Sequence, residues 1–523
     1  MGFNKLWRPP KPITMKHFRF LFLVLCLCES GFAQRTVLSY PFEMEKSFLQ
    51  KANYDAYFLD NQATNNFAFI LKDNKKVDYV LVNDKFKVGS EFVKNLEETV
   101  FDHDTHLYLG GTTDKNVYHY VYKVTDKKFM STSTTYMEET VDFDSKTIAA
   151  KKIFDIPGEE HLLVSFCDHN HYFTITANKK TSDLHFYQVL ANGEATDKTI
   201  NFDVPAGMSK DKNELTKYLA DLKVIREGEE PGLDVATSSA KLFCYADKLV
   251  FTINDGDKPT HLFSVDLTNF TGTSTFIDHS SLVEKENRGK SYVSSFLKDD
   301  KAFALILNKK DIKIAVYNES DGSLVNKVVI DGDDGIDMLT EPPVTETRMG
   351  KSRKDQDVDN LKKVIKAFTN GTEGLTVGTN KNGQFVLQVG TYDLIPMNTG
   401  GGVPMGHYQG GFESNPGYQG QQNVEKYTWN PAHTYVPGSS GYMATSARYY
   451  RTTYFKLLLD PKTLKPVHGR APALVGDQVK DYIDDSDKRA KAAKQFAMAD
   501  RQYYGFYDRD GLTYVIEEIS IRK

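Results

Sequence analysis

The chain is poor in cysteine, and half of its cysteines lie near the N-terminus. Of the four cysteines, Cys26 and Cys28 fall in an apolar leader, which leaves only Cys167 and Cys244 beyond it. Two cysteines in a chain of this length exclude a disulfide framework. Both follow apolar runs in matching contexts, VSFCDHNH and KLFCYADK. We expect two separate buried thiols, with one disulfide as the alternative in an oxidising compartment.

Beyond the leader, the chain also lacks long hydrophobic runs and a strong charge of either sign. No later stretch approaches the ~18 consecutive apolar residues that a membrane-spanning helix needs. The formal net charge is −5, whereas general nucleic-acid binding needs a basic surface. We therefore expect no transmembrane segment in the mature chain and no nucleic-acid partner.

Recognisable catalytic motifs are missing as well. We find no Gly-x-Ser-x-Gly elbow, no His-Glu-x-x-His pair and no phosphate-binding glycine loop. In the run CDHNH, the side chains of Cys167, His169 and His171 would share one face if the chain were extended, and such a set suits zinc. The same run also suits a tight turn, which would scatter the three ligands. We expect no catalytic residue, no cofactor and no resident metal, with this run as a weak metal candidate.

The N-terminal segment has the pattern of an export signal. Residues 16–33 read KHFRFLFLVLCLCESGFA, with a basic start, a short apolar core and small residues before Gln34. This pattern predicts a secretory signal peptide that ends at residue 33. Met15 is an alternative start, and residues 1–14 would then be an extension.

Most of the remaining chain consists of strand-like repeats. Each repeat reads as an apolar strand, a polar turn, an alternating strand, a second turn and a third strand. Three clear copies begin at His171, Lys248 and Lys301, and weaker copies begin at Asn65, His106, Gly383 and Tyr503.

A repeat of about 40–50 residues built from antiparallel strands is typical of a β-propeller blade. We predict an all-β fold in which residues 35–523 form one propeller, with seven blades as the favoured number. The segment RTVLSYPFEM (Arg35–Met44) is expected to close the last blade, in which only two strands are clear. A pair of β-sandwiches and a ring of six or eight blades remain open.

Insertions are expected to interrupt this ring at residues 209–235, 331–371, 394–447 and 472–502. Three segments have helical patterns. Residues 209–227 place Leu215, Tyr218, Leu219 and Leu222 on one helical face. Residues 357–371 place Val358, Leu361, Ile365 and Phe368 likewise and stop at Asn370 and Gly371. Residues 475–500 are rich in Lys and Ala and are expected to be a polar helix.

The third insertion has an unusual composition. Between Leu394 and Ala447 the chain has ten Gly, five Tyr and one Trp, but only three charged side chains. Disordered segments are usually charged and poor in aromatic residues, whereas binding loops combine aromatic anchors with adaptable polar residues. We predict a partner-binding loop whose anchors are Tyr408, Phe412, Tyr418, Tyr427, Trp429, Tyr435 and Tyr442. A solvent loop without a role is the alternative.

By its signal peptide and its blades rich in Phe and Tyr, the chain resembles exported bacterial β-propeller proteins of the Gram-negative envelope. The resemblance covers nearly all of residues 35–523, but its features are architectural, and Trp-Asp and kelch signatures are missing. It implies a periplasmic location at the outer membrane and an outer-membrane or periplasmic protein partner. In its sharper form it implies a plug-like subunit of a type IX protein secretion translocon.

Three functions follow as alternatives. The favoured one is a non-enzymatic scaffold or plug of an outer-membrane secretion complex. A glycan-binding propeller would also use surface Tyr and Trp, to stack against sugar rings. An envelope hydrolase would need carboxylates that converge at the centre of the ring.

Overall fold

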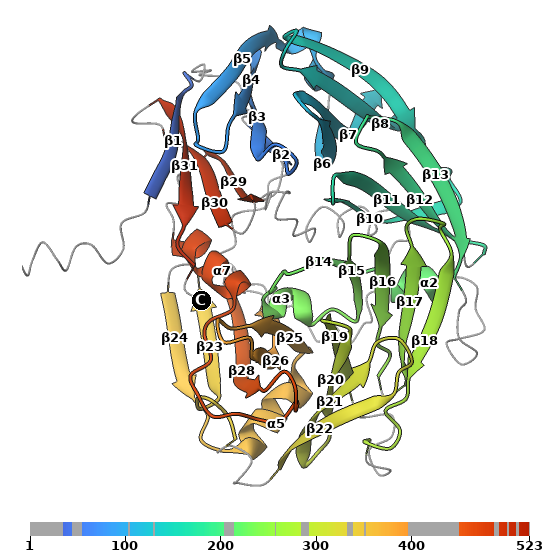
Figure 1. Cartoon of the computed structure of the whole chain (residues 1–523), viewed down its shortest axis with the longest axis vertical. Helices are drawn as coiled ribbons and strands as arrows, with labels where there is room; N and C mark the ends of the chain where they lie inside the picture. The colour runs from blue at the N-terminus through green and yellow to red at the C-terminus, as the bar shows by residue number, and fades with distance from the viewer. Residues whose placement is uncertain are drawn as a thin grey trace, which may run out of the picture.

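The computed structural model describes most of the chain between residues 35 and 521. The described residues are 35–43, 55–102, 105–128, 131–181, 183–202, 214–256, 258–283, 292–331, 338–349, 352–395, 449–485, 491–498, 501–508 and 512–521. Within them the strands form seven sheets, which are arranged as a ring around a central axis (Figure 1). The predicted all-β propeller is confirmed, and we treat each sheet as one blade.

The first three blades are four-stranded, antiparallel and follow the chain from the axis outward. Blade 1 contains β2 (Asp55–Asn61), β3 (Asn66–Lys72), β4 (Lys76–Val82) and β5 (Val88–Asn95). Blade 2 contains β6 (Thr105–Asp114), β7 (Val117–Lys128), β8 (Ser131–Asp142) and β9 (Thr147–Phe154). Blade 3 contains β10 (Glu160–Asp168), β11 (His171–Asn178), β12 (Asp183–Val189) and β13 (Ala195–Asn201).

Blade 4 has an extra strand next to the axis. It contains β14 (Lys223–Arg226), β15 (Ala240–Cys244), β16 (Lys248–Ile253), β17 (Thr260–Asp266) and β18 (Gly272–Ile277). The extra strand, β14, runs parallel to β15, whereas the other neighbours pair antiparallel. Blade 5 contains β19 (Tyr292–Lys298), β20 (Lys301–Leu307), β21 (Asp311–Asn318) and β22 (Leu324–Asp331).

Blade 6 departs most from the repeat. It contains β23 (Val344–Met349), β24 (Ser352–Asp357), β25 (Glu373–Thr379), β26 (Phe385–Thr391), β27 (Asp393–Ile395) and β28 (Tyr449–Leu459). The order is β24-β23-β28-β26-β25, and β27 pairs with β28 beyond the end of β26. The predicted insertion after residue 394 therefore splits this blade.

Blade 7 joins the two ends of the chain. It contains β29 (Lys491–Met498), β30 (Arg501–Asp508), β31 (Thr513–Ile519) and β1 (Arg35–Pro41). β1 pairs antiparallel with β31, from Arg35 opposite Glu518 to Pro41 opposite Thr513. This confirms the predicted closing strand. The pairing covers β31, which would otherwise end the sheet with unpaired backbone groups.

The ring is held together by apolar packing between the blades. The inner strands of neighbouring blades contact one another, as β29 contacts β2 and β2 contacts β6. At the first of these seams, the rings of Phe58 and Phe496 stack with their centroids 4.2 Å apart. Both faces of most blades are therefore buried, which explains the high content of Phe and Tyr.

The helices in the described residues lie in the insertions or between blades. They are η2 (Leu96–Glu98), η3 (Val100–Asp102), α2 (Glu214–Tyr218), α3 (Leu233–Ala236), α5 (Leu361–Asn370) and α7 (Val475–Asp485). The prediction for 357–371 holds from Leu361 to Asn370, where α5 buries Leu361, Ile365 and Phe368 and ends before Gly371. Val358 was also expected on this helical face, but it lies before the helix, which starts after its N-cap Asn360.

The predicted helix over 209–227 is wrong for its second half. The helix α2 ends at Tyr218, and Lys223–Arg226 form β14. Its β-branched residues, Val224 and Ile225, pair with β15 and are buried, an environment that favours a strand.

The predicted helix over 475–500 is also only partly correct. The helix α7 ends at Asp485, but Lys491–Met498 form β29, the inner strand of blade 7. Ala and Lys favour a helix locally. The tertiary contacts outweigh that preference, because Phe496 packs on Phe58 and Lys494 Nζ lies 2.9 Å from Asp55 Oδ1.

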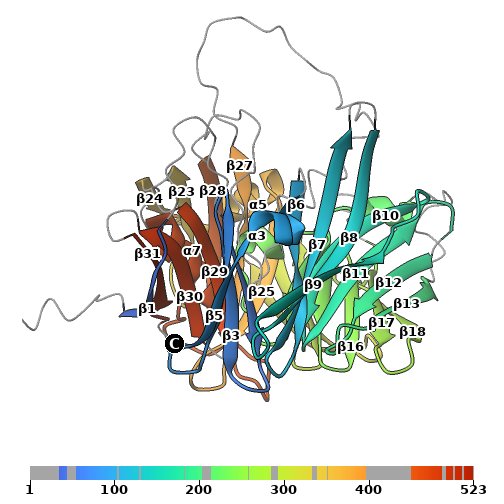
Figure 2. The ribbon, with the colours of Figure 1, turned by 90° about the horizontal axis from the view of Figure 1, so that it is seen from above.

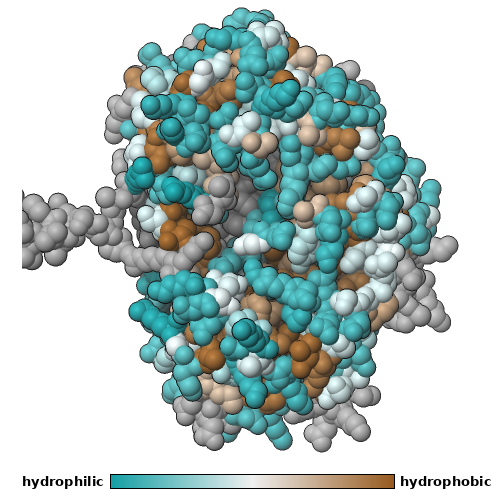
Figure 3. Space-filling view, in the orientation of Figure 1, coloured by the Kyte–Doolittle hydropathy of each residue, from teal (hydrophilic) through white to brown (hydrophobic). Residues whose placement is uncertain are grey.

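The surface of the ring shown in Figure 3 is mostly hydrophilic, with apolar residues scattered over it. Within the described residues, we find no helix of the length and apolar character that crossing a membrane requires.

Candidate functional site

The seven aromatic anchors of the predicted loop lie outside the described residues. The structure does describe both points at which this insertion leaves blade 6. We define the insertion base as β27, the first residues of β28, Tyr392 and the part of α7 that contacts them. Figure 2 shows β27 at one face of the ring, which we call the insertion face.

The two ends of the insertion leave the blade side by side. Asp393, Leu394 and Ile395 lie opposite Arg451, Tyr450 and Tyr449 in an antiparallel ladder. β28 then continues into the blade between β23 and β26. The span between the two ends is therefore fixed by backbone pairing.

A lysine of α7 lies over two tyrosines, one in this ladder and one directly before it. The ammonium of Lys480 is 4.2 Å from the ring centroid of Tyr450 and 4.5 Å from that of Tyr392. The two rings are themselves 5.3 Å apart. Burial disfavours the charged form of Lys480, but Asp234 and the two tyrosines outweigh burial and raise its pKa above the ordinary value. A lysine that stays charged over two aromatic faces forms cation–π contacts.

The helix α7 is itself fixed to the outer part of blade 6. Asp481 Oδ1 lies 2.8 Å from Arg348 Nη2, and its Oδ2 lies 3.4 Å from Arg353 Nη1. Glu346 Oε2 lies 3.1 Å from Arg353 Nη2, so the charges form a network and not an isolated pair. The guanidinium of Arg348 is almost fully buried, which makes this network stiffer than an exposed ion pair.

The N-terminal end of α7 is anchored to the segment that follows β14. The backbone N–H of Gly476 donates to the carbonyl of Glu230. The carboxylate of Glu230 accepts from the N–H of Val475 and from the N–H of Thr379 at the end of β25. The insertion base is thus connected through α7 to the segment between β14 and α3, which lies near the axis (Figure 1).

A largely buried arginine, whose side chain is 13% exposed, ties this segment near the axis to blade 3. The guanidinium of Arg226 donates from Nε and Nη2 to the carbonyl of Cys167, at 2.9 and 2.8 Å. Its Nη1 lies 3.2 Å from Glu229 Oε1, and its Nε lies 3.7 Å from Asp168 Oδ1. The charged groups of Arg226, Asp168 and Glu229 therefore pair with one another within the fold.

The weak metal candidates have separate partners. Cys167 Sγ accepts from the N–H of Gly111, His169 Nδ1 lies 2.7 Å from Asp168 Oδ2, and His171 Nδ1 lies 2.9 Å from Gln188 Nε2. His169 and Asn170 both have positive φ, which is typical of a tight turn. The run CDHNH therefore forms the turn that was given as the alternative to a metal site. Among the described residues, no three His, Cys, Asp or Glu side chains are grouped as metal ligands.

The two cysteines are both buried and free. The structure therefore agrees with the expected pair of separate buried thiols, and not with the alternative of a disulfide between Cys167 and Cys244. Burial raises the pKa of the Cys167 thiol to about 12, so Cys167 is a poor nucleophile.

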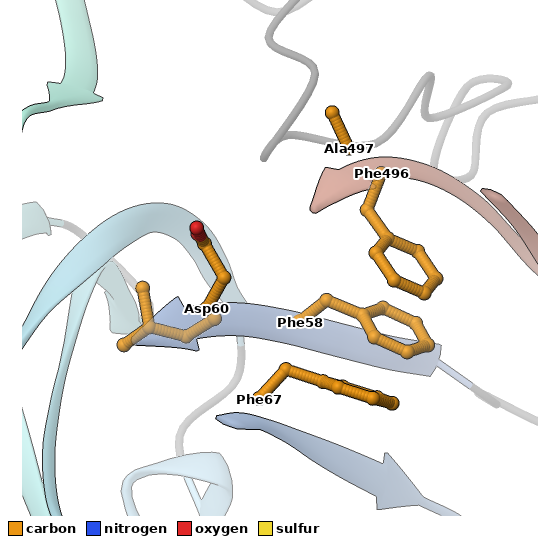
Figure 4. A pocket seen from close by; sticks show the side chains of 6 residues that line it. Phe58, Asp60, Phe67, Phe496 and Ala497 are labelled. Carbon is orange, nitrogen blue, oxygen red and sulfur yellow. The ribbon is translucent and has the colours of Figure 1, made fainter. Parts of the chain in front are cut away.

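A small recess lies at the seam between blades 7 and 1 (Figure 4). It is lined by Phe58, Leu59, Asp60, Phe67, Phe496 and Ala497. The aromatic rings pack against one another, and the carboxylate of Asp60 points away from them (Figure 4). We regard this recess as a packed seam and not as a ligand site.

Sequence reasoning did not identify the residues of the insertion base. Tyr392 and Tyr450 flank the predicted insertion on either side, but their positions alone do not distinguish them from other strand tyrosines. Lys480 lies in a segment that reads as a polar helix with an ordinary solvated face. The signal that was available is the aromatic residue at each edge of the insertion.

Comparisons with known proteins add little to this description. No protein-family model and no curated protein matches the chain. Among solved structures, the β-propeller domain of the Trilobed protease from Pyrococcus furiosus matches at 8% identity and a TM-score of 0.25, over 80% of this chain and 95% of that one. An ACO/RPE65 chimera matches at 7% identity and a TM-score of 0.27, over 56% of this chain and 67% of that one.

Cobalt-substituted Synechocystis ACO matches at 7% identity and a TM-score of 0.26, over 54% of this chain and 62% of that one. The match thus spans less than two thirds of the Synechocystis protein. Similarity at this level carries no argument about function, and the fold assignment rests on the strand pairing described above.

Proposed function

We propose that this protein is a non-enzymatic, exported β-propeller that acts as a protein-interaction scaffold in a bacterial envelope. Its partner is an outer-membrane or periplasmic protein, and the insertion between β27 and β28 is the docking element. In the sharper form of the proposal, the protein is a plug or gating subunit of an outer-membrane protein secretion complex.

The insertion base is the observation that carries the proposal. A binding loop gains affinity when its ends are held in place, because less freedom is lost on binding. Here the two ends are paired in β27 and β28, and Lys480 contacts an aromatic residue on each side. A loop without a role has no need of such a base.

The composition of the insertion indicates the kind of contact. Tyrosine and tryptophan supply large contact areas and a hydrogen-bonding group at low entropic cost. With only three charged side chains between Leu394 and Ala447, the insertion can enter a confined protein site with a small desolvation penalty. Such a site includes the mouth of an outer-membrane channel.

The test is affinity purification of the tagged protein from detergent-solubilised envelopes. The informative variant has residues 398–446 replaced by a short Gly-Ser link, since the paired ends then stay in place. A matched control replaces residues 203–213, between β13 and α2, in the same way.

We expect a large outer-membrane protein to co-purify with the native protein and with the 203–213 control, but not with the 398–446 variant. If all three forms are isolated alone, the scaffold proposal fails. Glycan arrays and hydrolase substrates then become the relevant assays.

A further inference from the structure

One seam of the ring differs in its chemistry from all the others. Each other pair of neighbouring blades, from 7 and 1 round to 5 and 6, shares a cluster of buried apolar residues. In the described part of the chain, no apolar cluster has members in both blade 6 and blade 7. The helix α7 lies between these two blades instead (Figure 1).

The helix α7 packs on blade 7 through apolar side chains. Val479 forms a buried cluster with Tyr504 and Ile519 of blade 7, and Tyr482 packs against this cluster. The ring centroids of Tyr482 and Tyr504 lie 5.8 Å apart. Separating α7 from blade 7 would expose this apolar surface to water, which is unfavourable in proportion to the area exposed.

The contacts of α7 with the outer part of blade 6 are charged and polar. Asp481 is bound by Arg348 and Arg353, and Lys480 lies over the ring of Tyr450. A largely buried ion pair adds little net stability, because both charges lose hydration when it forms and regain hydration when it separates. Separating α7 from blade 6 therefore costs less free energy than separating it from blade 7.

The strand β28 has one face of each kind. Phe455 belongs to the apolar cluster that blade 6 shares with blade 5. Thr452 and Tyr450 belong to the other face, because successive residues of a strand point to opposite sides. In the ladder with β23, Thr452 lies opposite Glu346 and Tyr450 lies opposite Arg348. The face of β28 that carries the partners of α7 is therefore the polar one.

We propose that the ring opens at the seam between blades 6 and 7, and that α7 moves together with blade 7. The opening separates Lys480 from Tyr450, so it releases the exit of the insertion from the rest of the fold. A partner that binds the insertion more tightly in one of the two states shifts the opening equilibrium, and the opening changes the affinity for that partner equally. This coupling rests on the proposed docking function, whereas the opening itself does not.

Thiol labelling of the purified protein under native conditions tests the opening. Thr452→Cys places a thiol on the polar face of β28, and Thr453→Cys places one on the opposite face of the same strand. The two threonines are 7% and 3% exposed, so a thiol at either position reacts only when the structure opens. Val479→Cys places a thiol between α7 and blade 7. The native Cys167 and Cys244 are buried and report global unfolding in each variant.

We expect the thiol of the Thr452→Cys variant to react about tenfold faster or more than the thiols of the Thr453→Cys and Val479→Cys variants. Its labelling rate should rise only weakly with urea, because opening the seam exposes little surface. The other rates should rise steeply with urea, as global unfolding requires.

A second pair of variants keeps the test decisive if a threonine variant does not fold, which rapid labelling of Cys167 would reveal. Gln388 hydrogen-bonds with Asp477 of α7, whereas its neighbour Leu387 belongs to the apolar cluster on the opposite face of the blade. Gln388→Cys should then react faster than Leu387→Cys, by a similar factor and with a similarly weak dependence on urea.

Equal rates with equal urea dependence on the two faces of blade 6 overturn the proposed opening. A Val479→Cys thiol that reacts as fast as the Thr452→Cys thiol overturns the joint movement of α7 and blade 7. Both measurements use the protein alone. Failure of the opening is therefore distinguishable from failure of the docking function, which is tested by co-purification.

Discussion

The ammonium of Lys480 lies 4.2 Å from the ring centroid of Tyr450, although thirty positions of the chain separate them. Tyr450 is the second residue of β28, the strand that follows the insertion, whereas Lys480 belongs to α7, a helix that is fixed to the rest of blade 6. This contact connects the exit of the insertion with the rigid part of the fold.

Replacing Lys480 by methionine should loosen the insertion base. The change keeps the aliphatic chain but removes the cation–π contacts, which are worth about 1 kcal/mol at partly buried sites. We expect faster hydrogen exchange at residues 393–395 and 449–451, and a similar loss of unfolding free energy in urea. Lys363→Met is the control, because Lys363 pairs with Asp359 at an exposed position and should matter little. Unchanged hydrogen exchange in the Lys480 variant would contradict the idea that Lys480 stabilises the insertion base.

Replacing Arg226 by methionine should destabilise the protein strongly. The carboxylates of Asp168 and Glu229 would lose their largely buried cation, and the carbonyl of Cys167 would lose two hydrogen bonds. Removing one partner of a buried ion pair costs roughly 3–5 kcal/mol. Urea unfolding measures this change. Arg470→Met is the control, since Arg470 is almost fully exposed, and equal effects of the two changes would contradict the role assigned to Arg226.

Replacing either of two adjacent glutamates, Glu138 and Glu139, by glutamine should change the unfolding free energy at pH 8. The two changes should have opposite signs. Both are fully buried. Burial raises the pKa of Glu139 to about 7, despite hydrogen bonds from Tyr79 and from the N–H of Val100. For Glu138, burial is outweighed by hydrogen bonds from His119 and Thr140, which hold its pKa below the ordinary value.

Since the folded form of Glu139 binds its proton more tightly than the unfolded form, stability is lost as the pH rises from about 4.5 to about 7. Glu139→Gln should therefore raise the unfolding free energy at pH 8 by about 1–3 kcal/mol and change it little at pH 4. Glu138 stabilises the fold above its unfolded pKa, so Glu138→Gln should lower the unfolding free energy at pH 8. Urea unfolding at the two pH values measures both, and the same sign for both variants at pH 8 would refute the assignment.

His185 should stabilise blade 3 at acidic pH. Its Nδ1 lies 2.8 Å from Glu160 Oε1, and its Nε2 lies 3.1 Å from Asp197 Oδ2. Burial lowers the pKa of His185, but the two carboxylates outweigh burial and raise it overall. Its contribution is complete below the unfolded pKa and is lost as the pH rises through the folded pKa. His185→Gln should cost about 1 kcal/mol at pH 5.5 and less at pH 8.5. An equal cost at both pH values would mean that the imidazolium does not bridge the carboxylates.

The sequence predicts the repeated part of the fold well, because local patterns decide it. The three clear repeats begin at His171, Lys248 and Lys301, which are the first residues of β11, β16 and β20. In each of these three strands, a continuous apolar run followed by a polar turn specifies a buried strand. The closing strand is predictable because the last blade lacks an outer strand.

Elements that depend on distant contacts were not predictable. Local propensity makes Lys491–Met498 look helical, and only the packing of Phe496 on blade 1 makes it a strand. The insertion base is non-local too, since Lys480 reaches Tyr392 across the whole insertion and the end of the blade. A pattern in a short stretch of sequence cannot predict the contact between Lys480 and Tyr392, because the two residues are far apart in the chain.

The central claim is that the aromatic residues of the insertion recognise a partner. The most direct measurement is the amount of envelope protein that co-purifies with two variants of equal size, determined by quantitative mass spectrometry. One variant has serine at the seven aromatic anchors: Tyr408, Phe412, Tyr418, Tyr427, Trp429, Tyr435 and Tyr442. The other has serine at seven polar positions of the same insertion: Gln409, Asn415, Gln419, Gln421, Gln422, Asn423 and Asn430.

The account predicts that the aromatic variant loses its outer-membrane partner by tenfold or more, since each buried aromatic anchor contributes about 1–2 kcal/mol or more. The polar variant should retain most of the partner. Equal recovery of the partner by both variants, or no partner with the native protein, would contradict the account.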